Sequence, residues 1–190
     1  MSDRDNLNNS LEIILEQYSQ SFADKIFPED SSETDDLMLV FGLNKEIKAR
    51  NKQYWGRELG KCWERIIIEL CKQTCDNFGG AIREGNDELC DLVVGTDAID
   101  TKYRIGSGDS GTLKKFRQYA AKLQERGYRP VLLILRNDSL PQAINSCAAG
   151  GWTVISRSNT YDYLYQIAGF DLESWLQARI NLYGIGENPN

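Results

Sequence analysis

The chain has 190 residues, 41% hydrophobic and 10% aromatic, which suits one globular domain rather than two unrelated catalytic domains. It contains no histidine, which excludes histidine-based zinc sites and serine–histidine or cysteine–histidine catalysis. The net charge is −6, but residues 41–136 carry 18 basic and 13 acidic side chains, so this central segment is compatible with nucleic-acid binding through one face.

Two features of the sequence bear on where the protein works. No apolar run approaches the roughly 18 residues of a membrane span, and MSDRDNLNNS lacks the basic-then-apolar order of a signal peptide. We therefore expect a soluble, cytoplasmic protein that makes no membrane contact. No cysteines have CxxC spacing, and we expect all five to be buried and reduced: Cys62, Cys71, Cys75, Cys90 and Cys147.

The first third of the chain predicts two helices separated by a linker. Residues 9–23 have helical apolar spacing and a candidate N-cap at Ser10, and we place this helix outside the main core. Residues 27–36 are acidic and serine-rich, which indicates a linker or exposed loop. A long helix is expected over residues 56–76, with a stripe of Leu59, Cys62, Trp63, Ile66, Ile67, Leu70 and Cys71.

The remaining chain alternates strands and helices. The apolar run RPVLLILR is typical of a strand in the middle of a sheet that is covered on both faces. We expect strands at 80–84, 90–94, 98–105, 129–136 and 152–156, and helices at 112–126, 140–149 and near the C-terminus.

The strand expected at residues 98–105 carries charges within an apolar sequence. Alternate side chains share a face, so Ala98, Asp100, Lys102 and Arg104 project to one side, and the opposite face is apolar. Asp100 and Lys102 lie roughly 6.6 Å apart along the backbone, at about 3.3 Å per residue, so both side chains could reach one bound atom. An edge strand that uses charge against aggregation is the alternative interpretation.

The position of Asp91 depends on the turn between its strand and the charged strand. An even number of residues between paired positions places Asp91 on the face of Lys102, whereas an odd number sends it to the opposite face unless a bulge intervenes. The even loop would gather two carboxylates and one ammonium. Two carboxylates that close repel each other unless a cation lies between them.

This combination of side chains is typical of a magnesium site. Mg²⁺ is held by carboxylates, other oxygens and water, and we take Asp91, Asp100 and the backbone carbonyl of Thr101 as candidate ligands. Mg²⁺, or Mn²⁺ in its place, would activate water for attack on phosphorus. Lys102 would orient that water and offset negative charge on the phosphoryl oxygens.

The elements over residues 56–136 follow the order helix, strand, strand with Asp91, strand with Asp100-Thr101-Lys102, helix and buried strand. This segment resembles the PD-(D/E)xK nuclease superfamily. The resemblance implies an α/β fold with an αβββαβ endonuclease-like core, a central mixed sheet flanked by helices, and extra N- and C-terminal helices. It also implies that Asp91, Asp100 and Lys102 are catalytic.

Two positions qualify the resemblance. Cys90 stands where the family has its proline, a position that is often relaxed. Many members add a glutamate from the first helix to the metal shell, and Glu64 is the candidate here, with Glu58 as the weaker one. An exposed helix residue is an equally good interpretation of Glu64.

Within the superfamily, the chain looks most like a small type II restriction endonuclease. That resemblance implies a Mg²⁺-dependent, site-specific deoxyribonuclease that cuts double-stranded DNA, and a homodimer if the site is a palindrome. Structure-specific nucleases of repair or junction processing share the motif. A non-catalytic DNA-binding module on the same fold is the alternative from a different class.

Basic and hydroxyl side chains near the motif are candidates for phosphate contact, although each alone could simply be solvated. Base reading is expected from residues 41–57 or 157–165. The candidates for DNA binding are Lys45, Lys48, Arg50, Lys52, Arg57, Arg104, Ser107, Ser110, Lys114, Lys115 and Arg117, with Thr112 as a further hydroxyl.

The run GSGDSG lacks the lysine of a phosphate-binding loop, so no nucleotide cofactor is expected. A single domain would comprise an N-terminal helix and acidic loop (1–40), a nuclease core (41–156) and C-terminal helices (157–190). The terminal helices could form a dimer surface, but packing within the chain is the favoured use of their apolar faces.

Overall fold

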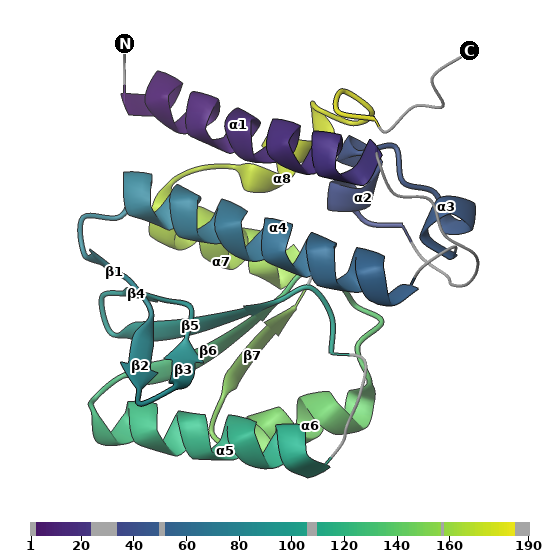
Figure 1. Ribbon diagram of the computed structural model, residues 1–190. Coiled ribbons are helices and arrows are strands. Elements are labelled where there is room, and N and C mark those ends of the chain that lie inside the picture. Colours follow the sequence, from purple (N-terminus) through teal and green to yellow (C-terminus); the bar gives the residue numbers. More distant parts are fainter. Residues whose placement is uncertain (1–2, 24–33, 50–51, 106–109, 157, 185–190) are drawn as a thin grey trace. The chain divides into compact units, whose positions relative to one another are not determined.

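The computed structural model describes residues 3–23, 34–49, 52–105, 110–156 and 158–184. The fold is α/β, with a mixed five-stranded sheet flanked by helices (Figure 1). The chain groups into two compact units, Met1–Glu69 with Asp171–Asn190, and Leu70–Phe170. A search of the described helices finds none with both the length and the apolar character that a bilayer crossing requires.

The first unit consists of helices. It contains α1 (Asp3–Ala23), α2 (Asp36–Val40), α3 (Lys45–Ala49), most of α4 (Lys52–Thr74) and α8 (Leu172–Gln177). Trp175 on α8 donates to Asn8 on α1 at 3.0 Å, and Arg179 pairs with Glu12 at 2.7 Å. Leu11 on α1 and Leu176 on α8 are fully buried, so packing within the chain is a use of the apolar faces of these helices.

The helix α1 begins earlier than the sequence indicated. It starts at Asp3, so Ser10 lies inside the helix and the prediction of Ser10 as an N-cap is wrong. Leu7, which is buried, continues the apolar spacing one turn before Leu11 and thereby extends the helix.

The end of the acidic segment predicted as a linker or exposed loop is helical. Residues 27–33 lie outside the described part, but Asp36 already opens α2. The Asp35 side chain accepts a hydrogen bond from the N–H of Met38 at 3.0 Å and so caps this short helix. The predicted long helix is confirmed as α4, and every residue of its predicted apolar stripe is buried.

The second unit contains the five-stranded sheet in the order β1-β4-β5-β6-β7. Neighbouring strands are antiparallel from β1 to β5 and parallel from β5 to β7. The edge-strand interpretation of the charged segment is wrong, because β5 lies in the middle of this sheet. The strands are β1 (Phe78–Gly79), β4 (Leu92–Val94), β5 (Asp97–Lys102), β6 (Arg129–Ile134) and β7 (Thr153–Ser156).

A separate two-stranded sheet is formed by β2 (Ile82–Glu84) and β3 (Asp87–Cys90). The single strand predicted at 90–94 is therefore divided at Asp91, with β3 before it and β4 after it. β5 also ends at Lys102, earlier than the predicted residue 105. Asp91 thus marks the position where the chain passes from one sheet to the other.

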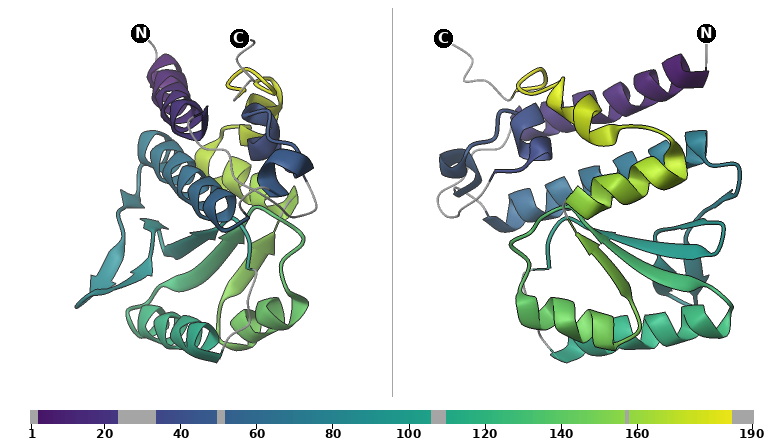
Figure 2. Two further views of the ribbon diagram at one scale, coloured as in Figure 1. Left: turned by 45° about the vertical axis from the view of Figure 1, so that its right-hand side comes forward. Right: turned by 180° about the vertical axis from the view of Figure 1, so that it is seen from behind.

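Helices cover both faces of the large sheet within the second unit. α5 (Ser110–Glu125) and α6 (Pro141–Ala149) lie on one face and α7 (Ser158–Ala168) lies on the other (Figures 1 and 2). On the α5 side, Ala98 and Leu132 from the sheet pack in one core with Phe116 from α5. All five cysteines are free and buried, as predicted.

Candidate active site

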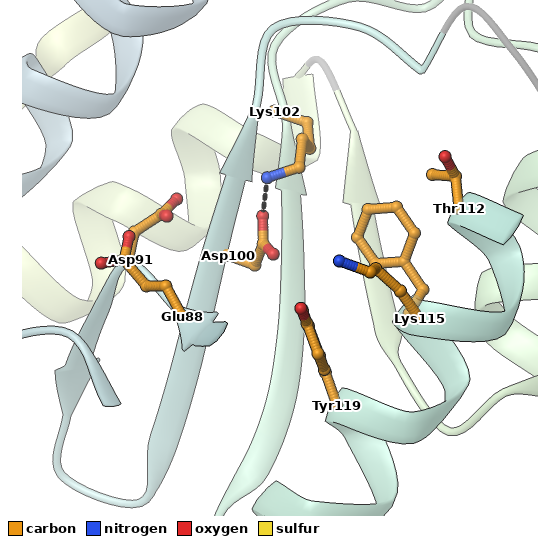
Figure 3. Close-up of a pocket in the computed structure, with 8 residues that line it drawn as sticks. Glu88, Asp91, Asp100, Lys102, Thr112, Lys115 and Tyr119 are labelled. Atoms are coloured by element: carbon orange, nitrogen blue, oxygen red, sulfur yellow. Dashed lines mark hydrogen bonds and ion pairs between the residues drawn. The ribbon is translucent and has the colours of Figure 1, made fainter. Parts of the chain in front are cut away.

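A pocket of about 310 Å³ lies between the charged strand and helix α5, entirely within the second unit. It brings together the three motif residues, Asp91, Asp100 and Lys102, and Figure 3 shows side chains of α5 projecting toward Asp100 and Lys102. The remaining lining residues are Glu88, Thr112, Lys115, Phe116 and Tyr119.

The turn between β4 and β5 determines where Asp91 lies. Val94 pairs with Asp97, so two residues separate the paired positions, and the even loop is the one that the chain adopts. Gly95 in this turn has φ +59, a backbone conformation that residues other than glycine rarely adopt. A Cβ added there would also meet Asn77 Nδ2 at 2.9 Å. Because Leu92 pairs with Ile99, continuing this register places position 91 opposite Asp100.

Asp91 is held by the strand that it faces. Its Oδ2 accepts hydrogen bonds from the backbone N–H of Thr101 at 2.6 Å and from the Thr101 hydroxyl at 2.7 Å. The N–H of Asp91 donates to Ile99 O at 2.9 Å. β4 begins only at Leu92, so the Asp91 carboxylate supplies an acceptor to β5 beyond the end of the β4 ladder.

Asp100 and Lys102 form an ion pair on the same face of β5 (Figure 3). The Lys102 ammonium also donates to Thr101 O at 3.1 Å and lies 5.8 Å from the centre of the Phe116 ring. Asp100 is only 7% exposed, so its charge is shielded from water and depends on such partners. The sheet therefore holds a buried carboxylate in its central strand, with a cation beside it.

Helix α5 supplies the opposite wall of the pocket through side chains one turn apart. Tyr119 donates to Asp87 Oδ1 at 2.7 Å, and the ammonium of Lys115 lies 3.5 Å from the same oxygen. Burial and this hydrogen bond raise the pKa of Tyr119 to about 12. The Tyr119 hydroxyl, followed by Lys115, lowers the pKa of Asp87, so Asp87 stays charged.

Thiol chemistry is disfavoured at this site. Cys90 adjoins Asp91 but is buried, and burial raises the pKa of its thiol to about 11. A thiol with a raised pKa is a poor nucleophile at neutral pH. The chemistry of the pocket therefore depends on carboxylates, amines and hydroxyls.

Two of the three candidate metal ligands, Asp91 and Asp100, line the pocket, and the third is the neighbouring Thr101 carbonyl. Asp91, Asp100 and the Thr101 carbonyl offer only oxygen atoms, which are the donors that Mg²⁺ prefers. Across the described ranges, no group of three or more cysteine, aspartate or glutamate side chains is placed to hold a metal ion. A metal here would keep several water ligands, as protein-bound Mg²⁺ usually does.

Comparison with known proteins identified no relative of this chain. No model of a protein family, no curated protein and no solved structure matches the chain. The functional interpretation therefore depends on the pocket itself.

The candidate DNA-binding residues divide into several groups. Lys114, Lys115 and Arg117 are exposed on α5, and Lys45 on α3 and Arg57 on α4 are exposed in the first unit. Arg57 pairs with Glu58 at 2.9 Å. Arg50 and Ser107 lie outside the described residues, and the side chains of Lys52 and Ser110 are not described.

Lys48 is the one described member of the DNA-binding set that the structure buries. Lys48 is 6% exposed and its ammonium lies 3.2 Å from the sulfur of Met38. A buried ammonium cannot reach a phosphate without leaving this environment, so Lys48 is a packing residue of the helical unit. Sequence position alone did not reveal this, because neighbouring lysines on a short helix differ completely in exposure.

Arg104 lies at the end of the charged strand and is engaged in a structural contact. It donates to the backbone oxygen of Asp138 at 3.0 Å, and Asp138 also receives a bidentate pair from Arg136 at 2.7 and 2.8 Å. Arg136 is 3% exposed. These bonds link the segments that follow β5 and β6, so Arg104 contributes to the position of the strand end.

Three lining residues, Glu88, Phe116 and Tyr119, are not among the residues predicted to be functional. Glu88 precedes Asp91 by three residues, and Phe116 and Tyr119 lie on α5. The usable signal was the spacing of Thr112, Lys115 and Tyr119, which places them on one helical face. Glu64 belongs to the first unit, so its predicted role as a metal ligand stays a prediction.

Proposed function

We propose that the protein is a Mg²⁺-dependent endonuclease that hydrolyses phosphodiester bonds in double-stranded DNA. The observation that carries this proposal is the convergence of Asp91, Asp100 and Lys102 on one pocket beside a central strand. Burying the charged Asp100 beside Lys102 costs desolvation free energy, which a charged residue kept only for solubility would avoid. This cost favours a functional site.

The order of elements supports an endonuclease-like αβββαβ core. The helix α4 precedes the antiparallel strands that end in β5, and α5 connects β5 to the parallel strand β6. Within the large sheet, β1, β4 and β5 followed by α5 and β6 agree with the order expected from the resemblance to the PD-(D/E)xK superfamily, while β2 and β3 form an additional small sheet. The charged motif lies on the face of β5 that α5 covers, together with Ala98.

Each residue of the motif has a role that follows from its contacts. Asp91 and Asp100, with the Thr101 carbonyl, would hold the metal; when bound, Mg²⁺ supplies the Lewis acidity that lowers the pKa of a water. Thr101 keeps the Asp91 carboxylate oriented through two hydrogen bonds. Lys102 provides a positive charge for the oxygens of the phosphate under attack.

Helix α5 could position the DNA backbone beside these groups. Lys115 and Thr112 line the pocket, and Lys114 and Arg117 are exposed on the same helix. Because cations that neutralise phosphates give a steep salt dependence, DNA affinity should fall strongly as salt concentration rises. Double-stranded DNA is therefore the substrate that we propose.

The finer proposal is a type II restriction endonuclease, which would act as a homodimer on a palindromic site. Digestion of a sequenced plasmid tests it, because a restriction enzyme gives a fixed set of fragments with common end sequences. A structure-specific nuclease would instead prefer a branched DNA over a linear duplex of the same sequence. No cutting of either substrate with Mg²⁺ or Mn²⁺ would refute the nuclease proposal.

One observation favours a second candidate, a non-catalytic DNA-binding module. Oxygens of both motif acids already have protein partners, Thr101 for Asp91 and Lys102 for Asp100. Such contacts could serve the fold alone. The module would bind duplex DNA with the same salt dependence, but binding would not require a divalent cation and no strand would be cut.

A further inference from the structure

The ammonium of Lys102 lies among the oxygens that the proposed function assigns to the metal. It forms an ion pair with Asp100 Oδ1 and donates to Thr101 O at 3.1 Å. These two groups belong to the candidate set of three protein ligands. An ammonium and a hard divalent cation both bind to oxygen atoms, so one site cannot satisfy both at full strength.

The third candidate ligand is held independently of Lys102. Asp91 Oδ2 accepts its two hydrogen bonds from Thr101, through the backbone N–H and the side-chain hydroxyl. Movement of the lysine side chain would leave both bonds intact. Asp91 can therefore remain in position while the partner of Asp100 changes.

We propose that Lys102 and a divalent cation compete for Asp100 and the Thr101 carbonyl, so that metal binding displaces the lysine ammonium. This inference rests on the proposed function. Without metal, the ammonium balances the charge of the buried Asp100 carboxylate, which would be unfavourable to leave unpaired. Displacement frees the same ammonium for a substrate phosphate, which couples metal loading to the assembly of the site.

The surroundings of Lys102 allow this exchange. Lys102 is the last residue of β5, and its side chain is 35% exposed. The lysine side chain has a flexible stem of four carbons, so the ammonium can move while the strand stays fixed. Phe116 lines the same pocket and offers the ammonium a cation–π contact. The centre of its ring lies 5.8 Å from the Lys102 ammonium.

Metal binding by the full-length protein without DNA tests the inference. Titration of Mn²⁺, followed by isothermal calorimetry and by electron paramagnetic resonance of free Mn²⁺, gives Kd for each variant. Lys102→Met keeps the length of the side chain but removes its charge. We expect its Kd for Mn²⁺ to be about tenfold lower than that of the unsubstituted protein, which corresponds to about 1.4 kcal/mol.

Two further variants separate competition from a general charge effect. Lys115→Met removes one positive charge from the same pocket, but Lys115 pairs with Asp87 rather than with a candidate ligand. We expect this variant to lower Kd by less than about threefold, since its effect is only long-range. Lys102→Arg keeps a competing cation and should have a Kd close to that of the unsubstituted protein.

The outcomes distinguish the inference from the proposed function. An unchanged or higher Kd for Lys102→Met, or an equal decrease for Lys115→Met, would overturn the competition. If the unsubstituted protein nevertheless cuts plasmid with Mn²⁺, the proposed function stands without it. Failure of every folded variant to bind Mn²⁺, with no cutting, would overturn both; thermal unfolding of each variant checks that it is folded.

Discussion

Thr101 donates two hydrogen bonds to a single oxygen of Asp91, from its backbone N–H at 2.6 Å and from its hydroxyl at 2.7 Å. These bonds join the central strand to the point where the chain crosses between the two sheets. Asp91 is consequently both a structural acceptor and a candidate metal ligand. Substitutions at either residue can separate the two roles.

Asp91→Ala should destabilise the fold more than Asp91→Asn. Alanine leaves the N–H of buried Thr101 without its acceptor, which costs about 1–3 kcal/mol of unfolding free energy. Asparagine keeps a carbonyl acceptor but loses the charge, so it should cost under about 1 kcal/mol while abolishing divalent-dependent cutting. Urea denaturation measures the first effect. Equal stabilities of the two variants would contradict this assignment.

Thr101→Val should lower the free energy of unfolding by about 1–2 kcal/mol, because it replaces the hydroxyl with a methyl group of similar volume. Thr101 is 5% exposed, so water cannot replace the lost bond. Thr101→Ser retains the hydroxyl and serves as the matched control. If Thr101→Val were as stable as the unsubstituted protein, the side-chain bond to Asp91 would have no measurable role.

The pH dependence of stability should report on Tyr119. Its folded-state pKa is raised to about 12, above the value of about 10 in an unfolded chain, so the folded state keeps the proton longer. The contribution of Tyr119 to the free energy of unfolding is therefore present below pH 10 and is lost as pH rises toward 12.

Tyr119→Phe cannot lose a proton and should show a smaller decrease in unfolding free energy between pH 9 and pH 11 than the unsubstituted protein. Urea titrations at the two pH values measure the difference. The substitution should also raise the pKa of Asp87, because the Tyr119 hydroxyl is the main cause of its lowering. Carboxyl carbon chemical shifts follow that titration, and an unchanged Asp87 pKa would contradict the hydrogen bond.

Asp138→Ala should be one of the most destabilising single changes in the sheet unit. It removes the bidentate partner of Arg136, whose guanidinium is 3% exposed and would remain buried beside Tyr103. Removing one partner of a fully buried pair costs about 3 kcal/mol or more, and because the Asp138 side chain is 26% exposed we expect about 2 kcal/mol here. A matched control is Asp162→Ala on α7, an exposed acid that should change stability by less than about 0.5 kcal/mol.

The strand periodicity was sufficient to predict which residues of β5 share a face. Alternation is a local property, so Asp100 and Lys102 could be placed together from the sequence. The location of β5 in the middle of the sheet was not predictable in this way, because strand order depends on pairing between distant segments. Charged residues suggested an edge, whereas the α5 pocket accommodates them inside the fold.

The break at Asp91 was also beyond the sequence pattern. Leu89, Cys90, Leu92 and Val93 form a nearly continuous apolar run, which indicates one strand. At the interruption, the Asp91 carboxylate accepts two hydrogen bonds from Thr101, a tertiary contact that local sequence does not reveal. Similarly, Lys48 was assigned to the surface because the burial of a lysine depends on neighbours such as Met38.

The most direct test of the nuclease proposal is digestion of a sequenced supercoiled plasmid with Mg²⁺, comparing the unsubstituted protein with Asp100→Ala and Lys102→Ala. We predict that the unsubstituted protein linearises or fragments the plasmid at fixed sequences, that chelation of Mg²⁺ stops the reaction, and that both folded variants lose at least about a hundredfold in rate. Cutting by folded Asp100→Ala at the original rate, or an intact plasmid with the unsubstituted protein, would contradict the assignment of this pocket as a nuclease site.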